Sequence, residues 1–343
     1  MKSVFRFLLS TIIIFIQCSY PGNKNTQGLF PTVIPSKIDS ISTCREVEEI
    51  INKLYDTLYR SEFKCLDPAH IHEFDRKFNH QCRLLADSLH SRRAFYKVDF
   101  DGNGYTDLLA IGRTGRWFNI PIVMNMGQDS LHLMELNRSF FSRCSWPVMD
   151  TIGNKPIIRY YEWKIYETKD GFKEKLTLDT LIYRFGGFVE YNPNPKKYHI
   201  KEIDFYAGPC YGSCPIFHLK INENGEATLE ALEYNKNIAT GQEMKGIFQT
   251  RLKNEDYQRI KDLLNYLDFP HLKKHYAVNW TDDQFVELRI FYEDENGKEK
   301  QKRINDYGKI GTHGLKLLYS LLFQLRNNQK WKKTGELPPE YMW

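Results

Sequence analysis

Residues 216–233 read IFHLKINENGEATLEALE, which is the pattern of a β-hairpin. Two strand-like runs, 215–222 and 226–233, lie on either side of the pair Asn224-Gly225. An Asn-Gly pair adopts the left-handed backbone angles that a tight turn between antiparallel strands requires. We therefore expect a hairpin here, and the rest of this half of the chain is interpreted around it.

Further strands and two helices surround the hairpin. Strands are expected at about 200–207 and 243–250, and two more, at about 285–292 and 299–305, lie on either side of Asn296-Gly297. Between these groups Asn254 is a candidate cap for a helix, and Pro270 marks its end. A last helix is expected over 312–328. The expected order is β4-α-β2-α, which predicts an α+β fold because runs of adjacent strands favour antiparallel pairing.

The first half of the chain also combines helices with strands. Thr43 and Glu46 have capping-box spacing before an apolar stripe, and a second helical pattern covers 71–89. Segments rich in β-branched and aromatic residues follow, at 94–98, 108–111, 120–126, 157–166 and 176–184. We expect helices packed on a mainly antiparallel sheet here as well, so the whole chain is expected to be α+β with two domains.

Length and composition fit this division. The chain has 343 residues, enough for two domains, and its 41% hydrophobic and 27% charged content excludes disordered, collagen-like and polytopic membrane classes. The segment Asn192-Pro193-Asn194-Pro195 resists both helix and central strand. The expected parts are a signal peptide at 1–17, a lipidated tether at 18–40, an N-terminal domain at 41–192, a linker at 193–197, a C-terminal domain at 198–333 and a tail at 334–343.

The N-terminus predicts export. Lys2 and Arg6 precede an apolar run over 7–16, which is too short to span a bilayer but fits a secretory signal. The run ends at Cys18 and resembles a relaxed bacterial lipobox of the Bacteroidota type, although Phe15 and Gln17 depart from the usual pattern. The resemblance implies that Cys18 is lipidated and anchors the protein to the inner or outer membrane, facing the periplasm or the cell surface. An uncleaved anchor and an ordinary signal peptide are the alternatives.

The remaining cysteines agree with an oxidising compartment. Six remain after Cys18, an even number that predicts disulfides in an exported protein. The short spacing favours a bridge between Cys210 and Cys214. The other four lie in the first half, and their connectivity stays open: Cys44, Cys65, Cys82 and Cys144.

The segment 99–107 reads DFDGNGYTD and carries candidate calcium ligands. The candidates are Asp99, Asp101, Asn103, Asp107 and the carbonyl of Tyr105. Calcium prefers several hard oxygen ligands, and Gly104 permits the sharp turn that gathers them. The pattern resembles the first nine positions of an EF-hand loop, but position 12 is Ala110. It is closer to the aspartate-rich calcium loops of FG-GAP repeats. A metal-free hairpin with Asx turns is the alternative; we expect a structural calcium ion.

The motif Gly208-Pro-Cys-Tyr-Gly-Ser-Cys-Pro215 carries a resemblance to a protein family. Followed by a strand and the Asn-Gly turn, it resembles the domain of unknown function family 6438 of Bacteroidota envelope proteins, over about 200–333. The resemblance implies a fold and a location but no activity. The cysteine spacing also resembles the copper motif of Sco-type proteins, with His218 the nearest histidine. A structural disulfide is expected, since the motif leads into a strand and not into a helix.

These observations favour a non-catalytic envelope lipoprotein that presents a protein- or glycan-binding surface. The alternative is a thiol-redox or copper-handling protein using Cys210 and Cys214. The net charge of +5 drops to +3 without residues 1–17, which is too weak to predict nucleic-acid binding. The common catalytic motifs are missing from the sequence. Enzyme activity is therefore unsupported, although a set of dispersed catalytic residues would escape a motif search.

Overall fold

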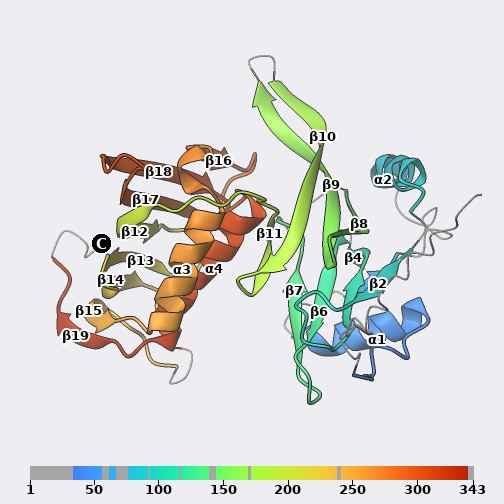
Figure 1. Cartoon of the computed structure of the whole chain (residues 1–343), viewed down its shortest axis with the longest axis horizontal. Helices are drawn as coiled ribbons and strands as arrows, with labels where there is room; N and C mark the ends of the chain where they lie inside the picture. The colour runs from blue at the N-terminus through green and yellow to red at the C-terminus, as the bar shows by residue number, and fades with distance from the viewer. Residues whose placement is uncertain are drawn as a thin grey trace, which may run out of the picture. The chain divides into compact units, whose positions relative to one another are not determined.

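The computed structural model describes residues 34–55, 62–66, 76–91, 93–115, 117–138, 144–168, 171–237 and 241–338. Strands make up 45% of the structure and helices 19%, so the fold is mainly β (Figure 1). The α-helices of the described residues are α1 (Cys44–Leu54), α2 (Arg76–Ser88), α3 (Asn254–Tyr266) and α4 (His313–Asn328). The expected α+β class is therefore wrong, because strands outweigh helices and form several sheets.

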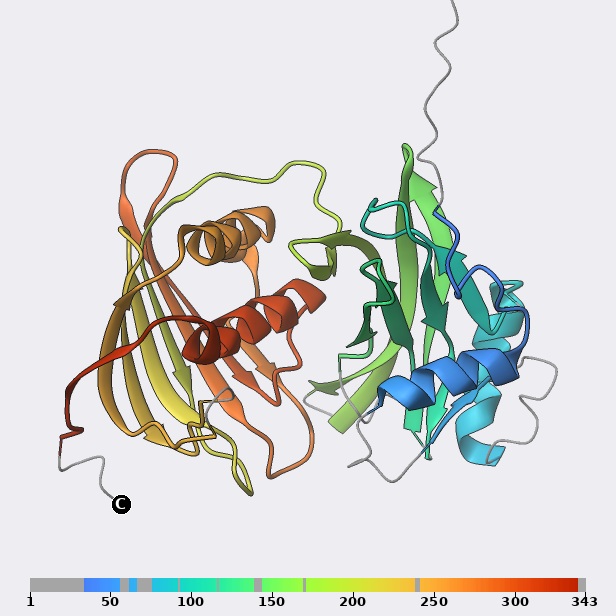
Figure 2. The ribbon, with the colours of Figure 1, turned by 90° about the horizontal axis from the view of Figure 1, so that it is seen from below.

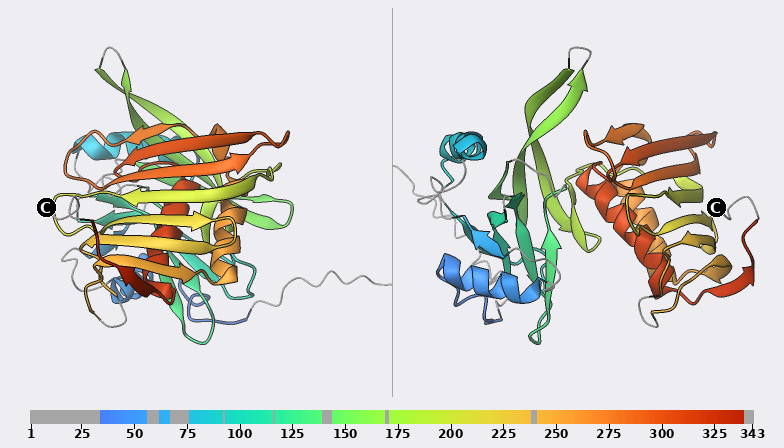
Figure 3. Two further views of the ribbon diagram at one scale, coloured as in Figure 1. Left: turned by 90° about the vertical axis from the view of Figure 1, so that its left-hand side faces the viewer. Right: turned by 180° about the vertical axis from the view of Figure 1, so that it is seen from behind.

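The hairpin at Asn224-Gly225 is confirmed and lies within an eight-stranded sheet (Figure 3). Gly225 has a φ of +76°, and its N–H donates to the carbonyl of Asn222 at 3.0 Å. The sheet is antiparallel apart from the pairing of its first two strands. Its strands in spatial order are β16 (His275–Ala277), β18 (Glu299–Tyr307), β17 (Phe285–Glu293), β12 (His199–Ala207), β13 (Ile216–Asn222), β14 (Glu226–Glu233), β15 (Gly246–Arg251) and β19 (Lys332–Gly335).

The expected order β4-α-β2-α omits two strands of this sheet. After α3 the chain forms a short 3-10 helix, Phe269–His271, and then β16; after α4 it forms β19. These strands have three and four residues and form the two edges of the sheet. Segments this short are held by pairing with a neighbour and carry too few apolar positions for a periodic signal.

Three smaller sheets form the first half of the described chain. One is β1 (Phe63–Cys65), β4 (Gly112–Thr114) and β5 (Trp117–Asn119). The second is β2 (Phe95–Val98), β3 (Asp107–Ala110), β6 (Pro121–Asn125) and β7 (Leu131–Glu135). The third is β11 (Gly187–Glu190), β10 (Gly171–Arg184), β9 (Lys155–Thr168) and β8 (Ser145–Ile152). The sequence did not predict β1, β4, β5, β7, β8 or β11, so it underestimated the strand content of this half.

The largest hydrophobic core cluster contains side chains of the eight-stranded sheet, of α3 and of α4. Figure 2 shows both helices on one side of that sheet. Ile182 and Val189, from β10 and β11, belong to the same cluster. Glu190 accepts hydrogen bonds from the backbone N–H groups of His313 (2.6 Å) and Gly314 (3.0 Å) at the start of α4. The division at 193–197 stays a prediction.

The sequence predicted the N-terminal cap of α1 correctly but not that of α3. Thr43 caps α1: its hydroxyl accepts from the N–H of Glu46, and the Glu46 carboxylate accepts from the N–H of Thr43 at 2.9 Å. This confirms the capping box. The cap of α3 is Lys253, without a side-chain hydrogen bond, and Asn254 is the first helical residue.

Candidate metal centre and the cysteine loop

The segment 99–107 is the connection between β2 and β3. Val98 pairs with Asp107, so the two strands bring the ends of the segment together. Gly102 and Gly104 have φ angles of +76° and +87°, which favour glycine. The two glycines let the loop turn sharply enough to point several side chains inward.

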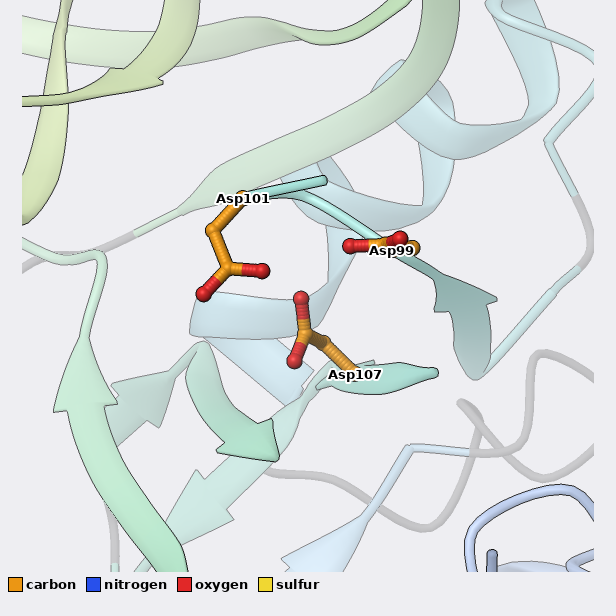
Figure 4. A group of neighbouring side chains, drawn as sticks. All are labelled: Asp99, Asp101 and Asp107. Carbon is orange, nitrogen blue, oxygen red and sulfur yellow. The ribbon is translucent and has the colours of Figure 1, made fainter. Parts of the chain in front are cut away.

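Three of the predicted ligands meet in this loop. Asp99, Asp101 and Asp107 each contribute a carboxylate oxygen to a group whose atoms all lie within 4.8 Å of one another. Figure 4 shows the three carboxylates facing a common point. Asp99 and Asp101 are half-buried, and Asp107 is fully buried. Three carboxylates at this separation repel one another, and a divalent cation would neutralise them.

Backbone hydrogen bonds hold Asp99 and Asp107 in position. The Asp99 carboxylate accepts from the N–H groups of Gly102 (2.8 Å) and Gly104 (2.9 Å). The Asp107 carboxylate accepts from the N–H of Phe100 (2.8 Å) and, on its other oxygen, from the N–H of Asn125 (2.7 Å). Each carboxylate oxygen has more than one acceptor site, so these bonds leave room for a metal.

Burial and the neighbouring carboxylates raise the pKa values of two aspartates of the cluster. Burial raises the pKa of Asp107 to about 7, and the neighbouring charges of Asp101 and Asp99 add to that rise. Burial also raises the pKa of Asp101, with a further contribution from Asp99. The cluster therefore favours partial protonation near neutral pH unless a cation occupies it.

Asn103 and Tyr105 are placed differently from the three aspartates. The side-chain oxygen of Asn103 accepts from the N–H of Tyr105 at 2.8 Å, and its amide group donates to the carbonyl of Asn125 at 2.8 Å. Tyr105 forms an isolated bridge with Ile34. These contacts stabilise the loop in the absence of any ion.

Asn125, at the end of β6, is a site residue that sequence reasoning missed. It is buried, and it holds both Asp107 and Asn103 through its backbone. The sequence did contain a hint: Asn125 is a polar residue in an otherwise apolar strand, and a buried polar group needs hydrogen-bond partners. Its partner depends on the pairing of β3 with β6, which no local pattern reveals.

Three disulfides are present among the described residues. They join Cys44 to Cys65, Cys82 to Cys144 and Cys210 to Cys214. The bridge within the motif is the one expected from the spacing, and the structure supplies the other two pairings. Cys18 lies outside the described residues.

The Cys210–Cys214 bridge closes a loop between β12 and β13. Both cysteines are half-buried. His218 lies within β13, where its Nε2 contacts Asp204 at 2.6 Å and its Nδ1 lies 3.5 Å from Glu230. Both nitrogens of the imidazole thus face carboxylates of the two neighbouring strands. This arrangement does not support a copper site that combines His218 with the two cysteines.

Comparison with known proteins identifies the C-terminal part only. The family model of the domain of unknown function DUF6438 matches residues 201–326. No curated protein and no solved structure matches the chain. None of the helices among the described residues is long and apolar enough to cross a membrane.

Proposed function

We propose that this protein is a non-catalytic lipoprotein of the cell envelope, anchored through a lipid on Cys18. Its folded part is a scaffold, stabilised by disulfides and one calcium ion, that presents a binding surface to a protein or a glycan. The carboxylate cluster at Asp99, Asp101 and Asp107 supports the calcium part of this proposal, because a divalent cation would neutralise carboxylates that lie within 4.8 Å of one another. The three disulfides support the exported location.

Calcium would have a structural role. Asp99, Asp101 and Asp107 would hold the ion, and it would remove the repulsion between their carboxylates. Asp107 also accepts the N–H of Asn125, so an ion at this position would stabilise the packing of the β2–β3 connection against β6. Extracellular calcium modules typically bind in the range of about 10⁻⁴–10⁻³ M, and we expect a value in that range.

A thermal melt of the non-lipidated protein, with millimolar calcium and with chelator, tests the ion. Calcium should raise the melting temperature of the wild type. Asp101→Asn should lose this response, because it removes one ligand charge, and should melt no lower than the wild type in chelator. Asp129→Asn is the control: this exposed aspartate pairs with Lys37 at 3.3 Å outside the cluster, and its response should be intact. Equal wild-type melts in calcium and chelator would refute the site.

The anchor has its own test. Metabolic labelling with a palmitate analogue should mark the wild-type protein in the envelope fraction. Cys18→Ala should lose the label and appear in the soluble fraction. A labelled Cys18→Ala protein would contradict the anchor while leaving the calcium scaffold untouched.

The second candidate function is thiol exchange, favoured by the partial exposure of Cys210 and Cys214. The two functions differ in the stability of the bridge. A structural bridge should have a reduction potential below about −300 mV, whereas oxidoreductases lie at about −120 to −270 mV. Mass spectrometry in graded thiol buffers measures this value, and we expect the structural range.

A further inference from the structure

The loop closed by Cys210 and Cys214 exposes one aromatic ring to solvent. Tyr211 is 88% exposed, the highest value among the exposed large hydrophobic side chains of the described residues. Leaving a tyrosine in water contributes nothing to folding, since the stabilising effect of an apolar ring comes from its burial. The ring is therefore available to a ligand.

The backbone beneath Tyr211 is held from several sides. The side chain of Gln284, itself buried, donates to the carbonyls of Gly208 (3.0 Å) and Pro215 (2.9 Å), the two ends of the loop. Lys309 donates to the amide oxygen of Gln284 at 2.8 Å. The disulfide closes the loop between these points. A loop held in this way loses little conformational entropy when a ligand binds.

Gly208 shows how closely the loop packs on the sheet. Its N–H donates to the carbonyl of Phe285 at 2.8 Å, and a Cβ at this position would lie 3.1 Å from the Phe285 ring and 3.3 Å from Tyr206. A side chain at position 208 would therefore be tight against these two rings. Tyr211, Gly212 and Ser213 at the tip of the loop are exposed to solvent, as is Pro209.

Acidic and aromatic residues lie beside the tip. The N–H of Tyr211 donates to the carbonyl of Asp282 at 3.2 Å, so residues 211 and 282 are neighbours. Asp282 is exposed, and the indole of Trp280 donates to the carboxylate of Asp283 at 3.2 Å. The backbones of Tyr211 and Asp282 thus lie side by side, and both residues are exposed to solvent.

We propose that Tyr211 and Asp282 form a binding site for a neutral oligosaccharide. One pyranose ring would stack its C–H face on Tyr211, whose π-face is the negative side of the ring quadrupole. Sugar hydroxyls would donate to the carboxylate of Asp282. This inference rests on the proposed function and names one of its two partner classes.

The size of the apolar area favours a glycan over a protein. A protein interface buries roughly 800 Å² on each partner around an apolar core. Of the other exposed large hydrophobic residues among the described ones, Leu84 lies on α2, Leu176 and Leu178 lie on β10, and Ile34, Met126 and Tyr234 lie outside the helices and strands. Tyr234 follows Glu233, which pairs with Ile216 at the end of the loop, so at most two exposed rings lie at this end of the sheet. This apolar area is small for a protein interface and suits the stacking of a sugar unit.

A panel of neutral hexasaccharides tests the site. Isothermal titration of calcium-loaded protein with β-1,4-glucan, chitin-type and α-mannan hexasaccharides should find at least one ligand. Tyr211→Ala should weaken that binding roughly tenfold, the loss of one stacked ring, and Asp282→Asn should weaken it less. Leu178→Ala removes an apolar side chain, 47% exposed, on β10 in a different sheet, and should bind as the wild type does. Unchanged melting temperatures would show that the variants fold.

Two results would overturn the site. They are the absence of binding to every hexasaccharide of the panel, and binding that Tyr211→Ala retains in full. Both leave the calcium-stabilised scaffold to be judged by its own melt, so the two proposals fail separately. Binding of an arginine-rich control peptide that Tyr211→Ala abolishes, without any glycan binding, would replace the glycan by a basic protein partner.

Discussion

At the scale of single residues, Asp107 is the most informative group of the molecule. It is fully buried, and two backbone N–H groups fix its carboxylate. The sequence predicted it as a ligand from its position in the loop. Its burial and its contact with Asn125 follow from the pairing of β3 with β6, which brings together residues 18 positions apart. The place of Asp107 beside Asp99 and Asp101 was therefore predictable from the sequence, but its burial and its raised pKa were not.

The raised pKa of Asp107 predicts an unusual pH dependence of stability. Burial raises this pKa from 3.8 to about 7, so the native state binds the proton more tightly than the unfolded state. Without calcium, the contribution of Asp107 to stability is therefore full below about pH 4 and is lost as the pH rises through about 7. The loss is on the order of 4 kcal/mol. Calcium should remove this slope by favouring the charged form.

Chemical denaturation at a series of pH values, in chelator and in calcium, measures this slope. Asp107→Asn is the comparison, because it cannot titrate. Its absolute stability will drop, since an amide cannot accept both backbone N–H groups, but the difference between its pH curve and that of the wild type isolates Asp107. Parallel curves in chelator would contradict the raised pKa.

At the scale of elements, sequence patterns predicted the features that depend on residues close together in the chain. The capping box of α1 and the Asn-Gly hairpin of β13 and β14 are both local, and both are present. Short strands such as β11 and β19 have four residues each and depend on a partner elsewhere in the chain. Because many strands are of this kind, local periodicity found the four α-helices of the described residues but missed many strands, and this gave the wrong fold class.

The disulfides predict a graded loss of stability when each is removed. The sequence separations are 62 for Cys82–Cys144, 21 for Cys44–Cys65 and 4 for Cys210–Cys214. Loop-closure entropy gives costs of about 4, about 3 and about 2 kcal/mol. Urea denaturation of the three double Cys→Ala variants should follow this order. A larger loss from Cys210–Cys214 than from Cys82–Cys144 would show that the motif has a greater role in folding than its short loop implies.

At the scale of the whole molecule, one buried ion pair connects distant parts of the described chain. Arg138 donates to Glu162 at 2.5 Å and to the carbonyl of Gly311 at 2.7 Å, just before α4. Both charged side chains are buried. No pattern in the sequence pairs these residues, because the contacts span 24 and 173 positions.

Arg138→Met should destabilise the fold by about 3–5 kcal/mol, because it leaves the Glu162 carboxylate buried without this partner. Arg138→Met combined with Glu162→Met should cost less than the single change. The exposed pair Arg45–Glu49 provides the control, and Arg45→Ala should cost less than about 1 kcal/mol. Urea denaturation midpoints measure all three. A single variant as stable as the double variant would contradict the role of the pair.

The calcium-stabilised scaffold is tested most directly by isothermal titration of the chelator-treated protein with calcium. We predict one site with a dissociation constant of about 10⁻⁴–10⁻³ M, absent in Asp101→Asn. Because Asp107 has a pKa of about 7, binding at pH 7 should release roughly half a proton, seen as a heat that changes with the ionisation enthalpy of the buffer. This release should shrink at pH 8. Titration without a binding heat, or with the same heat in Asp101→Asn, would contradict the account.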